Sequence, residues 1–143
     1  MVGIGIIIVA HVRLAEELLK AAEMITDRKL NNFKAVSINL SDHPDKARKK
    51  ILAAVKSIDT GEGVLILVDM FGGTPSNLSL SLLSEGKIEI ITGVNLPMII
   101  EAADKSQKEK LPELVNILSL SGQKGIRSAS EILSREVKER EES

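Results

Sequence analysis

One histidine and one aspartate in this chain each come directly after a run of apolar residues. His11 ends the stretch IIIVAH at residues 6–11, and Asp69 follows the apolar run Val64–Val68. A neutral imidazole is a nucleophile near neutral pH. A carboxylate that is hydrogen-bonded to one ring nitrogen fixes the tautomer and leaves the other nitrogen free to attack. It also stabilises the positive charge that the ring carries after the attack. If these two side chains meet, they form a site that can accept a phosphoryl group and pass it on.

The stretch DMFGGTPSN, residues 69–77, offers a place for the phosphoryl group itself. Two glycines let a ligand approach the backbone closely, and a Thr-Pro pair suits the N-cap and first position of a helix. The free N–H groups of that helix start would face the space beside Asp69 and suit a phosphate-sized anion. The predicted phosphoryl-binding residues are Gly72, Gly73, Thr74 and Ser76.

Each of these features also has an ordinary structural explanation. A lone histidine is more often structural than catalytic, and an aspartate at a strand end often caps a helix. The GGTP sequence is usually only a turn with a cap, and it does not match the phosphate-loop pattern. His43 precedes Pro44 in a predicted helix cap, and we interpret it as exposed and structural. The functional interpretation therefore depends on His11 and Asp69 lying side by side.

The elements that must bring them together follow from the hydrophobic pattern. Short β-branched runs alternate with segments whose apolar residues have helical spacing. The expected strands cover residues 4–9, 35–40, 64–68 and 88–92, and the expected helices cover 14–25, 41–58, 75–83, 96–103 and 111–120. This alternation predicts a doubly wound α/β fold with a mostly parallel sheet of four strands and helices on both faces.

Ligands of open parallel sheets bind beyond the carboxyl ends of the strands, where the strand order reverses. In the order 2-1-3-4, the strands that end at His11 and Asp69 are neighbours at that point. The sequence does not show the order, so this step is an assumption. The one basic residue near these strand ends is Arg13, and such a site is better suited to holding and passing on a phosphoryl group than to strong anion binding.

Composition excludes several classes of function. With 19 basic and 20 acidic residues, the chain has no electrostatic footprint for nucleic acid or a membrane surface. No cysteine and only two histidines are present, so we expect no metal and no cofactor. The chain lacks an apolar run of about 18 residues and a basic leader. We therefore expect a cytoplasmic protein that is not inserted into a membrane.

The same residues resemble the mannose-type IIA components of the bacterial phosphotransferase system. IGIIIVAHVRLAEELLKAAEMI is similar to the family's opening strand, phosphorylated histidine and first helix, and LVDMFGGTPSNLSLSLL is similar to its most recognisable motif. IEIITGVNLPMIIEA and GQKGIRSASEIL are also similar to family patterns. The resemblance covers nearly the whole chain.

The resemblance implies a phosphotransferase. His11 would accept a phosphoryl group from the phosphocarrier HPr and pass it to a separate IIB protein for sugar uptake, with Asp69 as its hydrogen-bond partner. It also implies a homodimer that exchanges an antiparallel fifth strand, supplied here by GIRSASEIL at 125–133. Val12 is a departure, because family members usually carry glycine after the active histidine, and it bears on rate and partner choice.

We expect a single domain over residues 1–134 and a charged tail over 135–143. Three alternatives remain. A regulatory signalling module would use the phosphohistidine to control partner binding without sugar transport. A receiver-like domain phosphorylated on Asp69 would need more acidic residues beside His11, where the sequence has none. A nucleotide binder would need a glycine-rich turn after the first strand, which is also missing.

Overall fold

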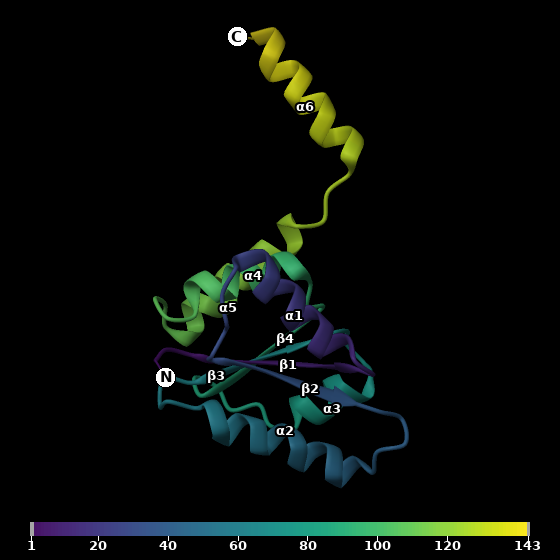
Figure 1. The fold of residues 1–143 in the computed structure, drawn as a ribbon, viewed down its shortest axis with the longest axis vertical. Helices are drawn as coiled ribbons and strands as arrows, with labels where there is room; N and C mark the ends of the chain where they lie inside the picture. Colours follow the sequence, from purple (N-terminus) through teal and green to yellow (C-terminus); the bar gives the residue numbers. More distant parts are fainter. Residues whose placement is uncertain (1, 143) are drawn as a thin grey trace.

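The computed structural model describes residues 2–142 and contains a parallel sheet with the strand order β2-β1-β3-β4, as predicted. The strands are β1 (Gly5–His11), β2 (Phe33–Ile38), β3 (Val64–Val68) and β4 (Ile88–Thr92). The helices are α1 (Leu14–Thr26), α2 (Pro44–Ile58), α3 (Thr74–Leu80), α4 (Leu96–Lys105), α5 (Leu111–Lys124) and α6 (Ala129–Glu142). Figure 1 shows α1, α4 and α5 on one face of the sheet and α2 with α3 on the other.

Alternate side chains of the central strands enter two separate hydrophobic cores. Ile6 and Ile8 of β1 pack with α1, α4 and α5. Ile7 and Val9 pack with α2 and with residues in and after α3. Because both faces are covered, the strands are continuous apolar runs rather than alternating ones. Burial on both sides makes the strands a rigid support for whatever follows their carboxyl ends.

The strand order reverses between β1 and β3. The chain passes from β1 through α1 to β2 on one side, and β3 then pairs with the opposite edge of β1. Val9 is the register partner of Val68, so Asp69 follows β3 close to where His11 ends β1. The assumption that these two strand ends are neighbours at the reversal point is therefore confirmed.

Two helix starts show how local sequence sets the boundaries. His43 is the N-cap of α2, and its exposed ring Nδ1 accepts a hydrogen bond from the Asp45 N–H at 3.2 Å. This agrees with its structural interpretation. Gly73 rather than Thr74 is the N-cap of α3, and Thr74 is already helical. The predicted cap was therefore one residue too late.

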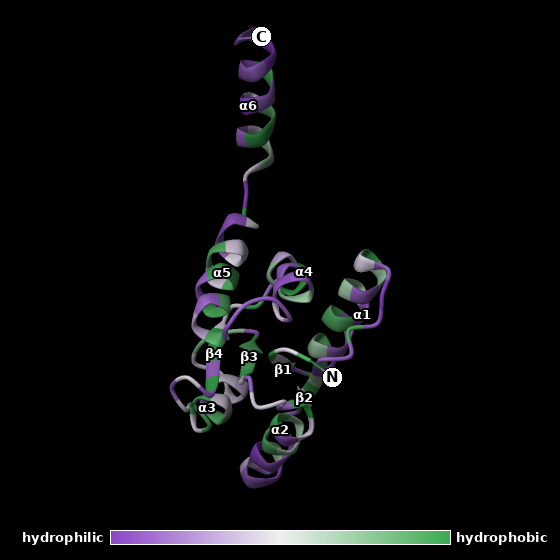
Figure 2. Cartoon of the chain, turned by 90° about the vertical axis from the view of Figure 1, so that its left-hand side faces the viewer, coloured by the Kyte–Doolittle hydropathy of each residue, from purple (hydrophilic) through white to green (hydrophobic). Residues whose placement is uncertain are grey.

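The segment after α5 differs from the prediction. Residues 126–128 form a link, and Ala129–Glu142 form α6, so the expected strand at 125–133 is absent from the described part of this single chain. Alanine, leucine, glutamate, lysine and arginine favour a helix when no neighbouring strand is available for pairing. Helix α6 projects away from the body (Figure 1), and Figure 2 shows it as mainly hydrophilic with a narrow hydrophobic stripe.

None of the residues of α6 is buried. The helix runs across the expected boundary between residues 134 and 135, and the described part of the tail is helical. Among residues 2–142, no helix is long and apolar enough to cross a membrane.

Candidate active site

The two predicted side chains meet at the carboxyl edge of the sheet. Oδ2 of Asp69 lies 2.6 Å from His11 Nδ1 and accepts the His11 backbone N–H at 3.0 Å. Oδ1 of Asp69 accepts the Met70 N–H at 2.9 Å. With Nδ1 engaged by a carboxylate, the proton of the neutral ring sits on Nδ1 and the lone pair lies on Nε2. The imidazole is about one third exposed, so solvent and partners can reach it.

The carboxylate of Asp69 is held in its charged form. Partial burial alone would raise the pKa of Asp69, but hydrogen bonds from the His11 N–H and ring, the positive charge of the ring when it is protonated, and the Met70 N–H lower it below 3.8. The side chain is only 11 % exposed, which strengthens these bonds. The site therefore places a fixed negative charge behind the ring, where positive charge would develop when Nε2 is phosphorylated.

The start of α3 lies against the histidine ring. In the alternation of β1, His11 points to the same face as Val9, which is the face that α3 covers. A Cβ added to Gly73 would stand 3.1 Å from His11 Cε1 and 3.5 Å from Nε2. Glycine at this position therefore leaves room beside the nitrogen that carries the lone pair.

The other predicted phosphoryl-binding residues differ in what they can offer. Gly72 has φ +89°, a left-handed conformation that glycine adopts without strain, and the space around it is open. The Thr74 and Ser76 N–H groups have no acceptor within the first turn of α3. The Ser76 hydroxyl is fully buried and has no hydrogen-bond partner in the described structure. Because Ser76 as a whole is buried, a bound group could reach its backbone N–H only if the start of α3 moved, and its side chain is not positioned to contribute.

Arg13, two residues after the histidine, is the N-cap of α1. Its guanidinium lies 3.7 Å from Glu16 and 3.8 Å from Glu17, both on the first turn of α1. These pairs are exposed and weak, so Arg13 can turn toward another anion at little cost. Arg13 is the basic residue that the sequence analysis predicted near the site.

Comparison with known proteins agrees with this geometry. A family model named EIIA-man and described as "PTS system fructose IIA component" matches residues 5–119, which is most of the chain and includes both His11 and Asp69. The chain belongs to the EIIA-man family. It is thus a IIA-type component of the phosphotransferase system, a family of phosphoryl-transfer proteins.

Named relatives within the EIIA-man family are moderately similar. The chain is 32 % identical to the "PTS system fructose-specific EIIA component" of Bacillus subtilis, over 92 % of this chain and 90 % of that protein. It is 32 % identical to the "PTS system mannose-specific EIIAB component" of Escherichia coli over 87 % of this chain, but it spans only 39 % of that protein's length. A crystal structure of "phosphotransferase system component EIIA" from Streptococcus agalactiae has a TM-score of 0.80 at 28 % identity and covers 90 % of this chain and 98 % of its own.

One backbone feature of this EIIA-man chain was not predicted from the sequence. Val12, directly after the histidine, has φ +56°, and its side chain is largely exposed. β-Branched residues rarely adopt the left-handed region, and such a conformation costs about 1–3 kcal/mol. The Val12 N–H donates to the Ile38 carbonyl at 3.1 Å, which continues the β1–β2 pairing and holds the residue in place.

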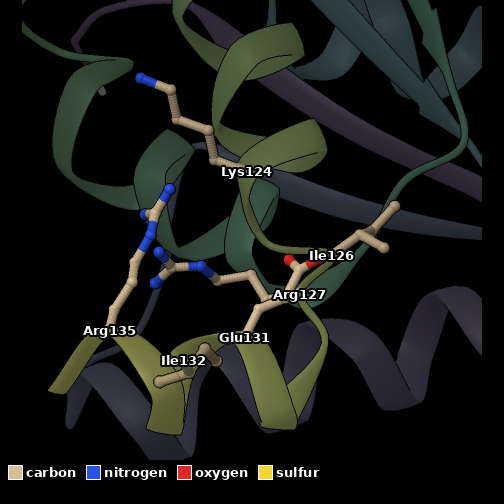
Figure 3. Close-up of a pocket in the computed structure, with 6 residues that line it drawn as sticks. All are labelled: Lys124, Ile126, Arg127, Glu131, Ile132 and Arg135. Carbon is tan, nitrogen blue, oxygen red and sulfur yellow. The ribbon is translucent and has the colours of Figure 1, made fainter. Parts of the chain in front are cut away.

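A separate hollow lies at the junction of α5 and α6 (Figure 3). Basic, acidic and apolar side chains from α5, from the link after it and from α6 line it, namely Lys124, Ile126, Arg127, Glu131, Ile132 and Arg135. One lining residue, Ile126, also lines a second hollow with Ile91 and Thr92 of β4. Neither His11 nor Asp69 lines the hollow at the α5–α6 junction, so it is distinct from the His11 site. Its lining is almost entirely exposed, because α6 touches the body so little.

Proposed function

We propose that this protein is a phosphoryl carrier that uses His11 as its acceptor. In the cytoplasm it takes a phosphoryl group from the phosphocarrier HPr and passes it to a separate IIB component, which uses it for sugar uptake. The single observation that carries the proposal is the 2.6 Å contact between His11 Nδ1 and Asp69 Oδ2, which leaves Nε2 free. Membership of the EIIA-man family supports it.

The proposed chemistry is a direct displacement at phosphorus. The Nε2 lone pair of His11 forms the new bond to phosphorus, while the donor's bond to phosphorus breaks and its electron pair stays with the donor atom. The ring of His11 then carries positive charge, with the proton still on Nδ1. Asp69 offsets that charge and accepts the Nδ1 hydrogen bond throughout. Onward transfer to the IIB protein is the same displacement in reverse.

The phosphoryl oxygens would rest on the backbone at the start of α3. The closeness of Gly73 to Nε2 supports this position. The N–H group of Thr74 would donate to the oxygens directly, and that of the buried Ser76 would do so after a small movement of the start of α3. Gly72 would let the loop fit around the group. Because α3 has only seven residues, these individual N–H donors matter more than a helix dipole.

The test is transfer from phosphorylated HPr, followed by intact mass and chemical stability of the product. We expect a gain of one phosphoryl group that is labile in acid and stable in base, as phosphohistidine is. The variant His11→Ala should gain nothing, and His43→Ala, which removes the other histidine, should behave as wild type. Acceptance by His11→Ala would rule out this site, and a base-labile product would indicate an acyl phosphate on Asp69.

A second measurement separates transport from regulation. Phosphorylated protein is mixed with candidate IIB proteins, and loss of its phosphoryl group is followed. Productive transfer is the expected result. If no IIB protein accepts the group although His11 is readily phosphorylated, the alternative of a signalling module that changes partners with its phosphorylation state would be favoured.

We also propose that the domain covers residues 1–134 and forms a homodimer by strand exchange. Apart from an isolated antiparallel bridge between Ile88 and Ser84, strand β4 pairs only with β3 in the described chain, so most of its outer edge is unpaired. Its Ile88 and Ile90 side chains are only partly buried. Exposed edges invite pairing with another strand. Residues 125–133 of a second copy, released from α6, are the proposed antiparallel partner.

A further inference from the structure

We propose that the hollow at the junction of α5 and α6 binds a small multivalent anion, a metabolite that carries phosphate groups. The bound anion holds α6 in its helical position and so opposes strand exchange. The site itself does not depend on the carrier role of His11, whereas its effect on assembly rests on the proposed strand exchange.

The hollow gathers three positive side chains that no carboxylate neutralises. Lys124, Arg127 and Arg135 line it, and Glu131 is the one acidic residue among its described lining residues. The three cationic side chains make no hydrogen bond or ion pair with any other residue of the described chain. Glu131 precedes Arg135 by four residues, a spacing at which such side chains commonly pair on a helix, but here they form no ion pair.

The two arginines point toward each other. Figure 3 shows the guanidinium groups of Arg127 and Arg135 directed at the same space, with the carboxylate of Glu131 set apart from them. A guanidinium presents its N–H donors in a planar fork that matches the oxygens of a phosphate group. Two such forks that face one space, with no counter-charge from the chain, suit an anion with several oxygens placed between them.

The size and surroundings of the hollow fit a small molecule. Its volume of about 440 Å³ lies within the range of small-molecule sites. Glu131 and Ile132 belong to the first turn of α6, where the first N–H groups have no acceptor within the helix and carry partial positive charge. Ile126 and Ile132 offer apolar contact to the carbon skeleton of an organic phosphate.

An anion in the hollow would join parts of the chain that otherwise contact each other little. Lys124 ends α5, Arg127 lies in the link, and Arg135 lies in α6, which buries none of its residues. Strand exchange needs residues 125–133 in an extended form, which breaks the arrangement of Arg127 and Arg135 around the hollow. A ligand that binds only the helical form stabilises that form at the expense of the exchanged one.

The experiment is calorimetric titration of the full chain with inorganic pyrophosphate, without divalent cations and at constant ionic strength. Wild type is compared with Arg127→Gln and Arg135→Gln, which remove one charge each and keep a long polar side chain. We expect each variant to bind about tenfold to hundredfold more weakly, as for the loss of a hydrogen bond to a charged group. Glu131→Gln, which removes the acidic lining residue, should bind about two- to fivefold more tightly.

The matched control is Lys56→Gln. It removes one positive charge from the exposed side of α2, which covers the opposite face of the sheet from α5 (Figure 1). Its affinity should stay within about twofold of wild type. Equal weakening by Lys56→Gln and the arginine variants would overturn the site and indicate a general effect of charge. Unchanged binding in both arginine variants would place the anion elsewhere, such as at His11, and overturn it as well, as would no binding to wild type.

Sedimentation equilibrium with and without pyrophosphate tests the effect on assembly. We expect pyrophosphate to raise the fraction of monomer in wild type but not in a variant that carries both arginine substitutions. A dimer that binds pyrophosphate with unchanged mass would overturn this effect. A wild type that is monomeric without pyrophosphate would refute strand exchange, and arginine-dependent binding would then still establish the anion site. Neither measurement involves transfer to His11, so failure of the carrier proposal would leave this inference intact.

Discussion

The hydrogen bond between His11 and Asp69 ties the stability of the site to pH. The pKa of Asp69 in the folded protein is below its ordinary value of 3.8. The charged carboxylate therefore contributes its full stabilisation above about pH 4, and this contribution is lost as pH falls through the lower folded value. We expect the difference in free energy of unfolding between wild type and Asp69→Asn to shrink as pH is lowered from 5 to 2.

Denaturant unfolding at several pH values measures this difference. Asp104→Asn is the control, because the pKa of Asp104 is also lowered, by Lys108, but Asp104 lies on the open surface. Exposed pairs contribute little, so that substitution should have almost no effect at any pH. A difference for Asp69→Asn that stayed constant down to pH 2 would contradict the assigned role of the carboxylate.

The two glycines of the 69–77 stretch should lose similar stability on replacement by alanine but differ in their effect on the rate of phosphoryl acceptance. In Gly73→Ala the new methyl group would crowd the ring of His11 at 3.1 Å, although the backbone angle suits any residue. We expect phosphoryl acceptance to slow by at least about tenfold with a stability loss of only about 1 kcal/mol, as for other N-cap replacements by alanine.

Gly72→Ala is the matched variant. Its methyl group meets nothing, but φ +89° is strained for alanine. That variant should lose about 1 kcal/mol with a smaller effect on the rate. Rates and unfolding curves for both variants test the pattern, and equal rate losses would show that loop conformation, not crowding of the ring, controls the site.

Sequence reasoning located His11 and Asp69 because each is anchored to a buried strand whose end the apolar run defines. Parallel strands bring such ends to one edge, so the pair followed once the strand order was assumed. The left-handed angle at Val12 could not be predicted, because valine ordinarily avoids that region and only the pairing with β2 imposes it. The cap of α3 was misplaced by one residue because both glycine and threonine are acceptable N-caps.

At the scale of elements, α3 contains an unfavourable feature that can be removed. The Ser79 hydroxyl is fully buried and has no hydrogen-bond partner in the described structure. An unsatisfied buried hydroxyl costs stability, and alanine is also the better helix former. We expect Ser79→Ala to stabilise the protein by about 1 kcal/mol.

Ser81 provides the comparison at the end of the same helix. Its hydroxyl donates to the Leu78 carbonyl at 2.6 Å and accepts from Arg48 Nε at 3.0 Å. Ser81→Ala should therefore be neutral or slightly destabilising. Thermal unfolding of the two variants measures the contrast, and destabilisation by Ser79→Ala would mean that its hydroxyl finds a partner such as a bound water.

The strands and the helices up to α5 could be predicted because burial imposes a clear period on their sequences. The expected third and fourth strands, 64–68 and 88–92, coincide with β3 and β4. The segment 125–133 has no such support. Its strand assignment came from family resemblance and requires a second chain, whereas the isolated chain follows local helix propensity and forms α6. In this segment, local helix propensity competes with strand pairing to a second chain, and a single chain can follow only the helix propensity.

At the scale of the whole molecule, this competition predicts how the protein associates. In one chain the outer edge of β4 has no partner strand, and α6 buries none of its residues. Strand exchange would pair that edge and bury part of the α6 segment. We expect the full chain in solution to have twice the 15.5 kDa mass of one copy. Sedimentation equilibrium or light scattering measures this directly.

Two truncations separate the exchanged segment from the tail. A chain ending at Ser134 keeps residues 125–133 and should remain a dimer, because the charged residues beyond 134 take no part in the proposed pairing. A chain ending at Gly125 loses the exchanged segment and should be a folded monomer, because none of the residues of α6 is buried against the body. A monomeric full chain would refute strand exchange. If instead the chain ending at Gly125 unfolds while the chain ending at Ser134 stays folded, the exchanged segment stabilises each subunit as well as the dimer. The edge of β4 would then depend on a strand that a single chain does not supply.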